Sequence, residues 1–193
     1  MWNKIFAKAS SQEPSQGQSH EPLQEPSRVP STKKMLSGLW FRFGIVCSLL
    51  LIALDQWTKY LALQHLQGRA PIVLLDNILG FRFLENNGAA WGMLGGQRLL
   101  LLIAPVIGCG ALAYFYFKTR GRNSILLALG IALIFAGGAG NLIDRAFRDG
   151  HVVDFIEVLF IQFPVFNVAD ICVTCGSVLS AIYLLFVEGR KNE

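Results

Sequence analysis

The chain has 193 residues, of which 53% are apolar and only 16% are charged, and its formal net charge is +4. Soluble domains usually have about 25% charged residues, so this shortage, with a mean hydropathy of +0.45, indicates a membrane protein. The four cysteines are too few for a disulfide-stapled secreted scaffold, and basic residues scattered at the ends of apolar segments argue against a nucleic-acid partner.

Residues 1–37 differ in composition from the rest of the chain. They contain four of the seven prolines, many Ser and Gln residues and almost no aliphatic periodicity. Such a stretch cannot bury enough apolar surface to offset the entropy lost on ordering. We expect a disordered cytoplasmic tail over residues 1–37 and one membrane domain over residues 38–193. No apolar core follows Lys4 and Lys8, so the tail does not have the pattern of a signal peptide.

Four apolar segments follow, at about 43–63, 99–117, 124–143 and 168–187. Each has about 20 residues, which at 1.5 Å per residue is enough to span a hydrocarbon core of ~30 Å. Within lipid, a single segment pairs all of its backbone polar groups only as a helix. The sequence therefore predicts an all-α membrane protein, built as a bundle of four transmembrane helices.

Basic residues predict the orientation of this bundle. They precede the first segment, fill the short link between the second and third, and follow the fourth, at Lys33, Lys34, Arg42, Lys118, Arg120, Arg122, Arg190 and Lys191. The two opposite loops are longer and carry both signs of charge. By the positive-inside rule, we expect both termini to be cytoplasmic and the two longer loops to face outward.

The loop after the first segment has a β pattern of its own. Residues 71–75 and 78–84 form two β-type runs, and Asp76 and Asn77 between them are typical of a turn. We expect a small extracytoplasmic β-hairpin here. Residues 89–97 then predict a short amphipathic segment, with Trp91 at the depth of the lipid headgroups.

Polar side chains near hydrocarbon are costly, so each needs a partner or a function. Asp55 and Lys59 are four residues apart in the first segment, in the order that favours an ion pair. Asn141 and Arg145 share a helix face in the same way, beside Asp144 and after the small residues 137–140. Small residues allow a neighbouring helix to approach closely. Structural pairing and a functional site both remain open for these two clusters.

Asp154 and Asp170 are the strongest catalytic candidates. Asp154 stands alone in the apolar run 152–156, whereas Asp170 follows Asn167 with the spacing of a helix capping box and, taken singly, fits a cap. The chain between the two aspartates leaves and re-enters the same membrane face, so both are expected at a similar depth near the outer surface. Two carboxyl groups close together in a low dielectric retain one proton, which suits general acid–base hydrolysis.

We assign Asp170 as the base, because the N-terminus of its helix favours negative charge, and Asp154 as the acid. Other catalytic schemes lack components. A serine nucleophile needs a nearby base, and the histidines stand at positions 20, 65 and 151, away from any suitable serine. Cys172 and Cys175 form a CxxC within the fourth segment, where small packing residues are more expected than metal ligands.

Five motifs in chain order resemble those of one family. They are Asp55-Gln56-x-x-Lys59, Asn86-x-Gly88-Ala89-Ala90, Gly140-Asn141-Leu142-Ile143-Asp144-Arg145, Val152-Val153-Asp154-Phe155 and Phe166-Asn167-Val168-Ala169-Asp170. Together they resemble the bacterial lipoprotein signal peptidases, also called signal peptidase II, over residues 40–187. Each motif alone is weak, but five in order on four predicted spans are highly specific.

The resemblance implies a multi-pass aspartyl endopeptidase of the bacterial cytoplasmic membrane, with its active site near the outer face. It would remove the signal peptide from a prolipoprotein by cutting before a Cys that carries a diacylglyceryl group. Asp154 and Asp170 would be catalytic, and the supporting or substrate-binding residues would be Asp55, Lys59, Asn86, Gly88, Ala89, Asn141, Arg145 and Asn167. The partners would be the lipidated substrate and membrane lipid, with no metal or organic cofactor, and we expect a monomer.

Some positions depart from the family pattern. Trp91 stands where Phe is usual, Asn87 where Thr is common, the spacing from Arg145 to Asp154 is one residue longer, and Ile-Cys follows Asp170. Two other functions remain as alternatives. Intramembrane acids also mark ion paths, which would suit a small proton-coupled transporter. The small residues 137–140 would also suit a non-catalytic membrane anchor that binds partner helices.

Overall fold

The computed structural model describes residues 32–88, 97–119 and 124–188. The chain divides into two compact units, Met1–Pro30 and Ser31–Glu193, and the described residues belong to the second. The expected tail therefore lies largely outside the described residues. The first helix, α1, begins at Thr32, inside the range expected for that tail.

The four expected membrane-spanning helices are present. They are α1 (Thr32–His65), α2 (Arg98–Thr119), α3 (Ile125–Phe147) and α4 (Val168–Ile182), which continues as a π-helical segment, η2 (Tyr183–Glu188). The stretches long and apolar enough to cross a membrane are Gly38–His65, Leu99–Lys118, Ile125–Phe147 and Val168–Val187. Large apolar side chains on these helices, such as Leu50 and Ile107, are about two-thirds exposed in the isolated chain, as expected where lipid is the neighbour.

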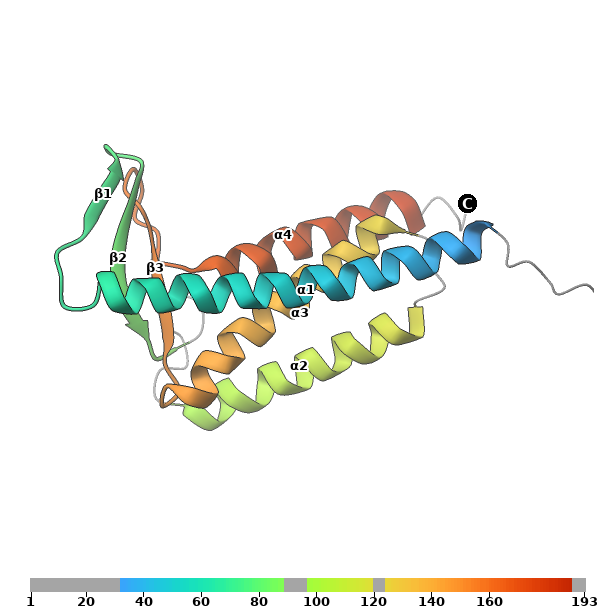
Figure 1. The fold of residues 1–193 in the computed structure, drawn as a ribbon, viewed down its shortest axis with the longest axis horizontal. Coiled ribbons are helices and arrows are strands. Elements are labelled where there is room, and N and C mark those ends of the chain that lie inside the picture. The colour runs from blue at the N-terminus through green and yellow to red at the C-terminus, as the bar shows by residue number, and fades with distance from the viewer. Residues whose placement is uncertain (1–31, 89–96, 120–123, 189–193) are drawn as a thin grey trace, which may run out of the picture. The chain divides into compact units, whose positions relative to one another are not determined.

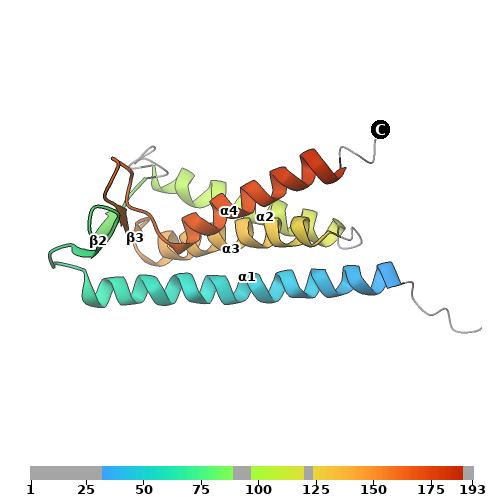
Figure 2. The ribbon, with the colours of Figure 1, turned by 90° about the horizontal axis from the view of Figure 1, so that it is seen from above.

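Helix α3 is the centre of the bundle, because it contacts α1, α2 and α4 (Figures 1 and 2). Gly130 and Gly137 of α3 are buried against α4, where an added methyl group would collide with the Ser180 side chain and with the backbone oxygen of Ala169. Small residues thus allow the two helices to approach closely, as the sequence predicted. Since Gly137 packs within the chain itself, this small-residue surface gives no support to binding of a partner helix.

A three-stranded antiparallel sheet joins two distant parts of the chain. Strands β1 (Ile72–Leu75) and β2 (Leu79–Asn86) form the predicted hairpin, and β3 (Val152–Val158) pairs with β2. At the hairpin turn Asn77 has a φ of 57°, a left-handed conformation that Asn tolerates better than most residues. The sequence analysis did not predict the third strand, which carries Asp154.

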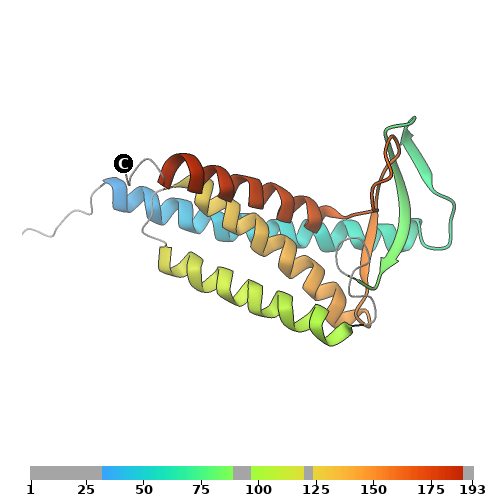
Figure 3. The same ribbon diagram turned by 180° about the vertical axis from the view of Figure 1, so that it is seen from behind.

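The sheet lies at one end of the bundle, where α1 and α3 end and α2 and α4 begin (Figures 1 and 3). Val153 and Phe155 of β3 pack against Ala62 and Leu66 at the end of α1. A separate apolar cluster lies between the helices, around Tyr116, Leu127, Ile131 and Tyr183. The first cluster fixes the sheet across the helix ends, and this contact positions the candidate site.

Candidate active site

The position of Asp154 follows from the alternation of side chains along a strand. Its neighbours Val153 and Phe155 point toward the end of α1, so Asp154 points to the opposite face of β3. There it lines a cavity and is only 2% exposed. A single acid in an apolar run is thus explained by a strand with one face on the core and one on the cavity.

Asp170 has two roles in the structure. Its backbone N–H donates to Asn167 Oδ1 over 3.0 Å, and Asn167 N–H donates to Asp170 Oδ2 over 3.1 Å, which forms the predicted capping box at the start of α4. The other carboxylate oxygen, Oδ1, accepts from Asn141 Nδ2 over 2.8 Å. Asp170 also lines the same cavity as Asp154, so it is a cap and a cavity residue at once.

Asn167 connects the two aspartates. Its side-chain Nδ2 donates to Asp154 Oδ1 over 2.6 Å, while its backbone and its Oδ1 hold Asp170. The same Nδ2 lies 3.1 Å from Asn141 Oδ1, and Asn167 is fully buried. Two carboxyl groups from separate chain segments are therefore brought to one buried asparagine. The sequence analysis expected the two aspartates to converge but did not predict this bridge.

The shared cavity has a volume of about 500 Å³, within the range of small-ligand and peptide sites. Its polar end is formed by the aspartates with Asn86, Asn141 and Arg145. The remaining walls are mostly apolar and come from the start of β3, the β3–α4 loop and the first turns of α4, at Val152, Phe163, Pro164, Val165, Phe166, Ile171, Val173, Thr174 and Cys175. The sequence analysis missed this wall, because loop residues give no periodic signal.

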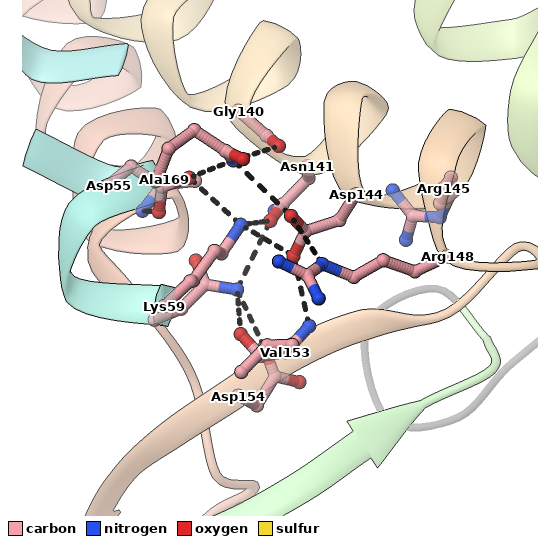
Figure 4. Close-up of polar contacts among 12 residues, drawn as sticks. Asp55, Lys59, Gly140, Asn141, Asp144, Arg145, Arg148, Val153, Asp154 and Ala169 are labelled. Atoms are coloured by element: carbon pink, nitrogen blue, oxygen red, sulfur yellow. Dashed lines mark hydrogen bonds and ion pairs between the residues drawn. The ribbon is translucent and has the colours of Figure 1, made fainter. Parts of the chain in front are cut away.

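A second, fully buried cluster lies next to the aspartates and is centred on Lys59 (Figure 4). Lys59 Nζ lies 2.9 Å from Asp55 Oδ2, which confirms the expected ion pair, and 2.8 Å from Asn141 Oδ1. It also lies 3.2 Å from Asp144 Oδ2. The other oxygen of Asp55 accepts from Ala169 N–H in the first turn of α4 over 2.9 Å. The cluster thus ties α1 to both α3 and α4.

Asp144 is a site residue that the sequence analysis did not select. Its Oδ2 accepts from Val153 N–H, directly before Asp154, over 3.0 Å. Its Oδ1 accepts from Gln56 Nε2 over 3.3 Å and from Arg148 Nε over 3.4 Å. Two signals were available, its place in the motif at residues 140–145 and its four-residue spacing to Arg148. Asp144 holds the backbone that carries Asp154.

The remaining expected residues lie at or just after the end of β2, at Asn86 and Gly88, and on α3, at Arg145. Asn86 Nδ2 donates to Asp154 Oδ2 over 3.0 Å, and Asn86 Oδ1 accepts from Gly88 N–H over 2.9 Å. Arg145 Nη2 donates to Gly88 O over 2.9 Å, which links α3 to this loop. Of the predicted positions, Ala89, Ala90 and Trp91 lie outside the described residues.

Burial raises the pKa of Asp154 to about 6, and the negative charge of Asp170 acts in the same direction. Hydrogen bonds from Asn86 and Asn167 favour the charged form and partly offset this rise. Within the described ranges, no cation forms an ion pair with either aspartate. Asp154 is therefore a carboxyl group that can hold a proton close to neutral pH, as a general acid requires.

The two cysteines of α4 lie in different environments. Cys172 is buried and Cys175 is exposed beside the cavity, and both are free thiols. In the part of the chain that the structure describes, no three His, Cys, Asp or Glu side chains are grouped to hold a metal ion. The packing role expected of the two cysteines fits the buried Cys172, whereas Cys175 is exposed.

Comparison with known proteins gives one family. Residues 47–186 match the family described as signal peptidase (SPase) II. A lipoprotein signal peptidase of Bacillus velezensis is 37% identical over 76% of this chain and 95% of its own, and one of Halalkalibacterium halodurans is 41% identical over 77% and 92%. A solved bacterial membrane enzyme, 32% identical, superimposes with a TM-score of 0.70 over 78% of this chain and 91% of that one. The chain therefore belongs to the signal peptidase II family.

Proposed function

We propose that Asp154 and Asp170 are the catalytic pair with which this chain removes signal peptides from prolipoproteins. The family makes the chain an aspartic-type endopeptidase, a lipoprotein signal peptidase. The observation that carries the assignment of the pair is the single cavity that both carboxyl groups line, with Asn167 bonded to each. Among the described residues, no feature favours the transporter or the anchor.

The two aspartates differ in the way that acid–base hydrolysis needs. Asp170 accepts hydrogen bonds on both oxygens at the N-terminal end of α4, where the helix dipole is positive, so it is suited to act as the base. Asp154 is suited to act as the acid, because burial favours its protonated form. These are the roles expected from the sequence.

Hydrolysis then proceeds in two steps. In the first, Asp170 takes a proton from water, the water oxygen attacks the scissile carbonyl carbon, and Asp154 gives its proton to the carbonyl oxygen. In the second, the protonated Asp170 gives its proton to the leaving nitrogen as the C–N bond breaks, and Asp154 recovers the proton of the hydroxyl. Both carboxyl groups end in their starting states, which is the exchange of roles that a shared-proton pair allows.

The position and the walls of the cavity suit a lipidated substrate. It lies at the end of the membrane spans and has apolar walls that include Phe163 and Ile171. A signal peptide can then lie among the helices while the diacylglyceryl group on the Cys stays in the bilayer. Anchoring both sides of the scissile bond supplies much of the rate, because it removes the entropy cost of bringing the groups together. Gly88 and Ala89 would border the small residue before the Cys.

We also propose that the sheet and the cavity face outward in the bacterial cytoplasmic membrane, with both termini cytoplasmic. The basic end of α2, at Lys118, lies at the opposite end of the bundle from the sheet (Figure 1), which supports this orientation. We expect the chain to act as a monomer. A green fluorescent protein fused to the C-terminus should fluoresce in cells, whereas an outward C-terminus would leave it dark.

One assay tests the function. The purified chain in lipid nanodiscs should shorten a diacylglyceryl-modified precursor, cut the unlipidated precursor far more slowly, and lose cleavage as Asp154→Asn. Retained cleavage in that variant would refute the catalytic pair. Ala89→Trp in the same assay should slow cleavage, and unchanged turnover would remove Ala89 from the substrate site. A proton flux through liposomes without any cleavage would instead support a transporter.

A further inference from the structure

The sheet carries an exposed apolar surface at its β1 edge and beyond the end of β3, which we name the sheet-tip patch. It consists of all four residues of β1, one residue of the following turn and two residues after β3, namely Ile72, Val73, Leu74, Leu75, Ile78, Phe160 and Ile161. Each of them is between 47% and 66% exposed. Leu159 N–H donates to Ile78 O over 3.0 Å, so the turn and the end of β3 are joined within this patch.

This surface is unusual for a sheet. Successive residues of a strand point to opposite faces, so Ile72 and Leu74 lie on one face and Val73 and Leu75 on the other. A sheet at the surface of a soluble domain covers one face with core and gives the other polar residues. Here both faces of an edge strand are apolar and uncovered. Contiguous apolar surface of this kind marks a contact with a partner or with lipid.

The position of the patch identifies the contact. The sheet crosses the ends of the helices, and β1 with its turn extends past α1 and α4 (Figures 1 and 3). Helix α1 ends at His65 and α4 begins at Val168, so the sheet stands at the level where the spans leave the bilayer. Trp57 and Tyr60, near that end of α1, are both more than half exposed, as in the aromatic belt of a membrane interface.

Exposed apolar side chains also occur on the chain that leads from the patch to the bundle. From Ile161 the chain runs through Phe163 and on to α4, where Ile171 and Val178 are exposed. Polar groups border the patch at the exposed hairpin turn, at Asp76 and Asn77. Apolar residues bordered in this way by polar ones are typical of elements that lie shallowly in the interface.

We propose that the sheet-tip patch lies in the membrane interface of the leaflet at the sheet end, with its apolar side chains against phospholipid acyl chains. The four spans would then have an additional lipid contact beside them. Because β1 is hydrogen-bonded to β2 and β2 to β3, this contact would hold β3 at a constant height over the bilayer. The inference depends on the membrane spans and not on the catalytic assignment.

Photocrosslinking tests it in the full chain. The photoreactive residue benzoylphenylalanine replaces Leu74 in β1 or, in a second variant, Ile78 in the turn, and each protein is irradiated in phospholipid nanodiscs. Intact mass spectrometry should show the added mass of one phospholipid at both positions, roughly tenfold above the same replacement at exposed, polar Glu85 of β2. Replacement of Val178 on the lipid-facing side of α4 is the positive control.

Three results would overturn the inference. The first is the absence of phospholipid adducts at positions 74 and 78 while position 178 forms them. The second is a main product that joins two copies of this chain, which would make the patch a dimer interface. The third is equal yield at positions 85 and 74, which would show contact with lipid but no selectivity of the patch. Cleavage activity of the same variants, measured in parallel, keeps this outcome separate from the catalytic proposal.

Discussion

Two neighbouring pairs of acidic residues, of which only Asp170 is not fully buried, differ in how their charge is balanced. Asp55 and Asp144 share the ammonium group of Lys59 at 2.9 and 3.2 Å. Asp154 and Asp170 are held by asparagine amides instead, and among the described residues neither has an ion-pair partner. A cation stabilises the ionised form of a buried acid, whereas neutral amides leave room for a proton. The first group is therefore suited to structure and the second to proton transfer.

Asn141 lies between the two groups and forms a hydrogen bond with each. Its Oδ1 accepts from Lys59 over 2.8 Å, and its Nδ2 donates to Asp170 over 2.8 Å. One amide thus faces the charged cluster with its oxygen and the reactive pair with its nitrogen. The contrast between the groups can be tested by removing charge from each and asking whether stability or catalysis is lost.

The largest expected effect is on catalysis. Asp154→Asn keeps the shape of the side chain but cannot exchange a proton, so the cleavage rate should fall by about 10³–10⁴-fold. The variant should remain folded in the same detergent, by circular dichroism and by its elution volume. If the variant loses activity because it unfolds, Asp154 would have a structural role like that of Asp55 and Asp144.

Lys59→Met should have the next largest effect, and on stability. It would leave Asp55 and Asp144 buried without their cation, which costs about 3–5 kcal/mol of the free energy of unfolding. Denaturant titration in mixed micelles measures this. Lys118→Met, at an exposed site near the end of α2, is the matched control and should change stability by no more than about 0.5 kcal/mol. Equal stability of the two variants would contradict a structural role for the cluster.

The pH dependence of stability should depend on Asp154. Its pKa rises from 3.8 in the reference state to about 6 in the folded chain, so between these pH values the folded state keeps a proton that the unfolded state releases. The contribution of Asp154 to stability should therefore be greatest below pH 4, fall as pH rises through this range, and be lower by roughly 2–3 kcal/mol above pH 6. Comparing wild type with Asp154→Asn isolates this slope. An identical slope in both would show that other groups cause it.

The smallest effect concerns the hydrogen bond from Asn86. Removing this donor as Asn86→Ala should disfavour the charged form of Asp154 and raise its pKa further, because the bond lowers it in the native protein. The alkaline limb of kcat/KM should move upward by roughly half to one pH unit, or about 1 kcal/mol. Thr58→Ala, which removes only hydrogen bonds to the backbone of α1, should leave the limb in place. A downward shift for Asn86→Ala would contradict the proposed acid role.

Much of the fold and of the candidate site could be predicted from local patterns in the sequence. Apolar length predicts the four spans, the turn residues Asp76 and Asn77 predict the hairpin, and short spacings predict the Asp55–Lys59 pair and the capping box at Asn167. Each of these features depends on residues close in the chain, so a window of a few turns contains the necessary information. The pair Asp154 and Asp170 was selected from the residues alone, and the five motifs added the family and the supporting residues.

Long-range contacts were decided only by the tertiary structure. The strand that carries Asp154 forms by pairing with β2, on the far side of two membrane helices in sequence, so no local period reveals it. The position of Asp144 beneath Val153 and the bridge that Asn167 makes between the aspartates likewise need the helices to be packed first. Packing also decides which apolar side chains of β1 remain exposed, because a side chain is buried only where another part of the folded chain covers it.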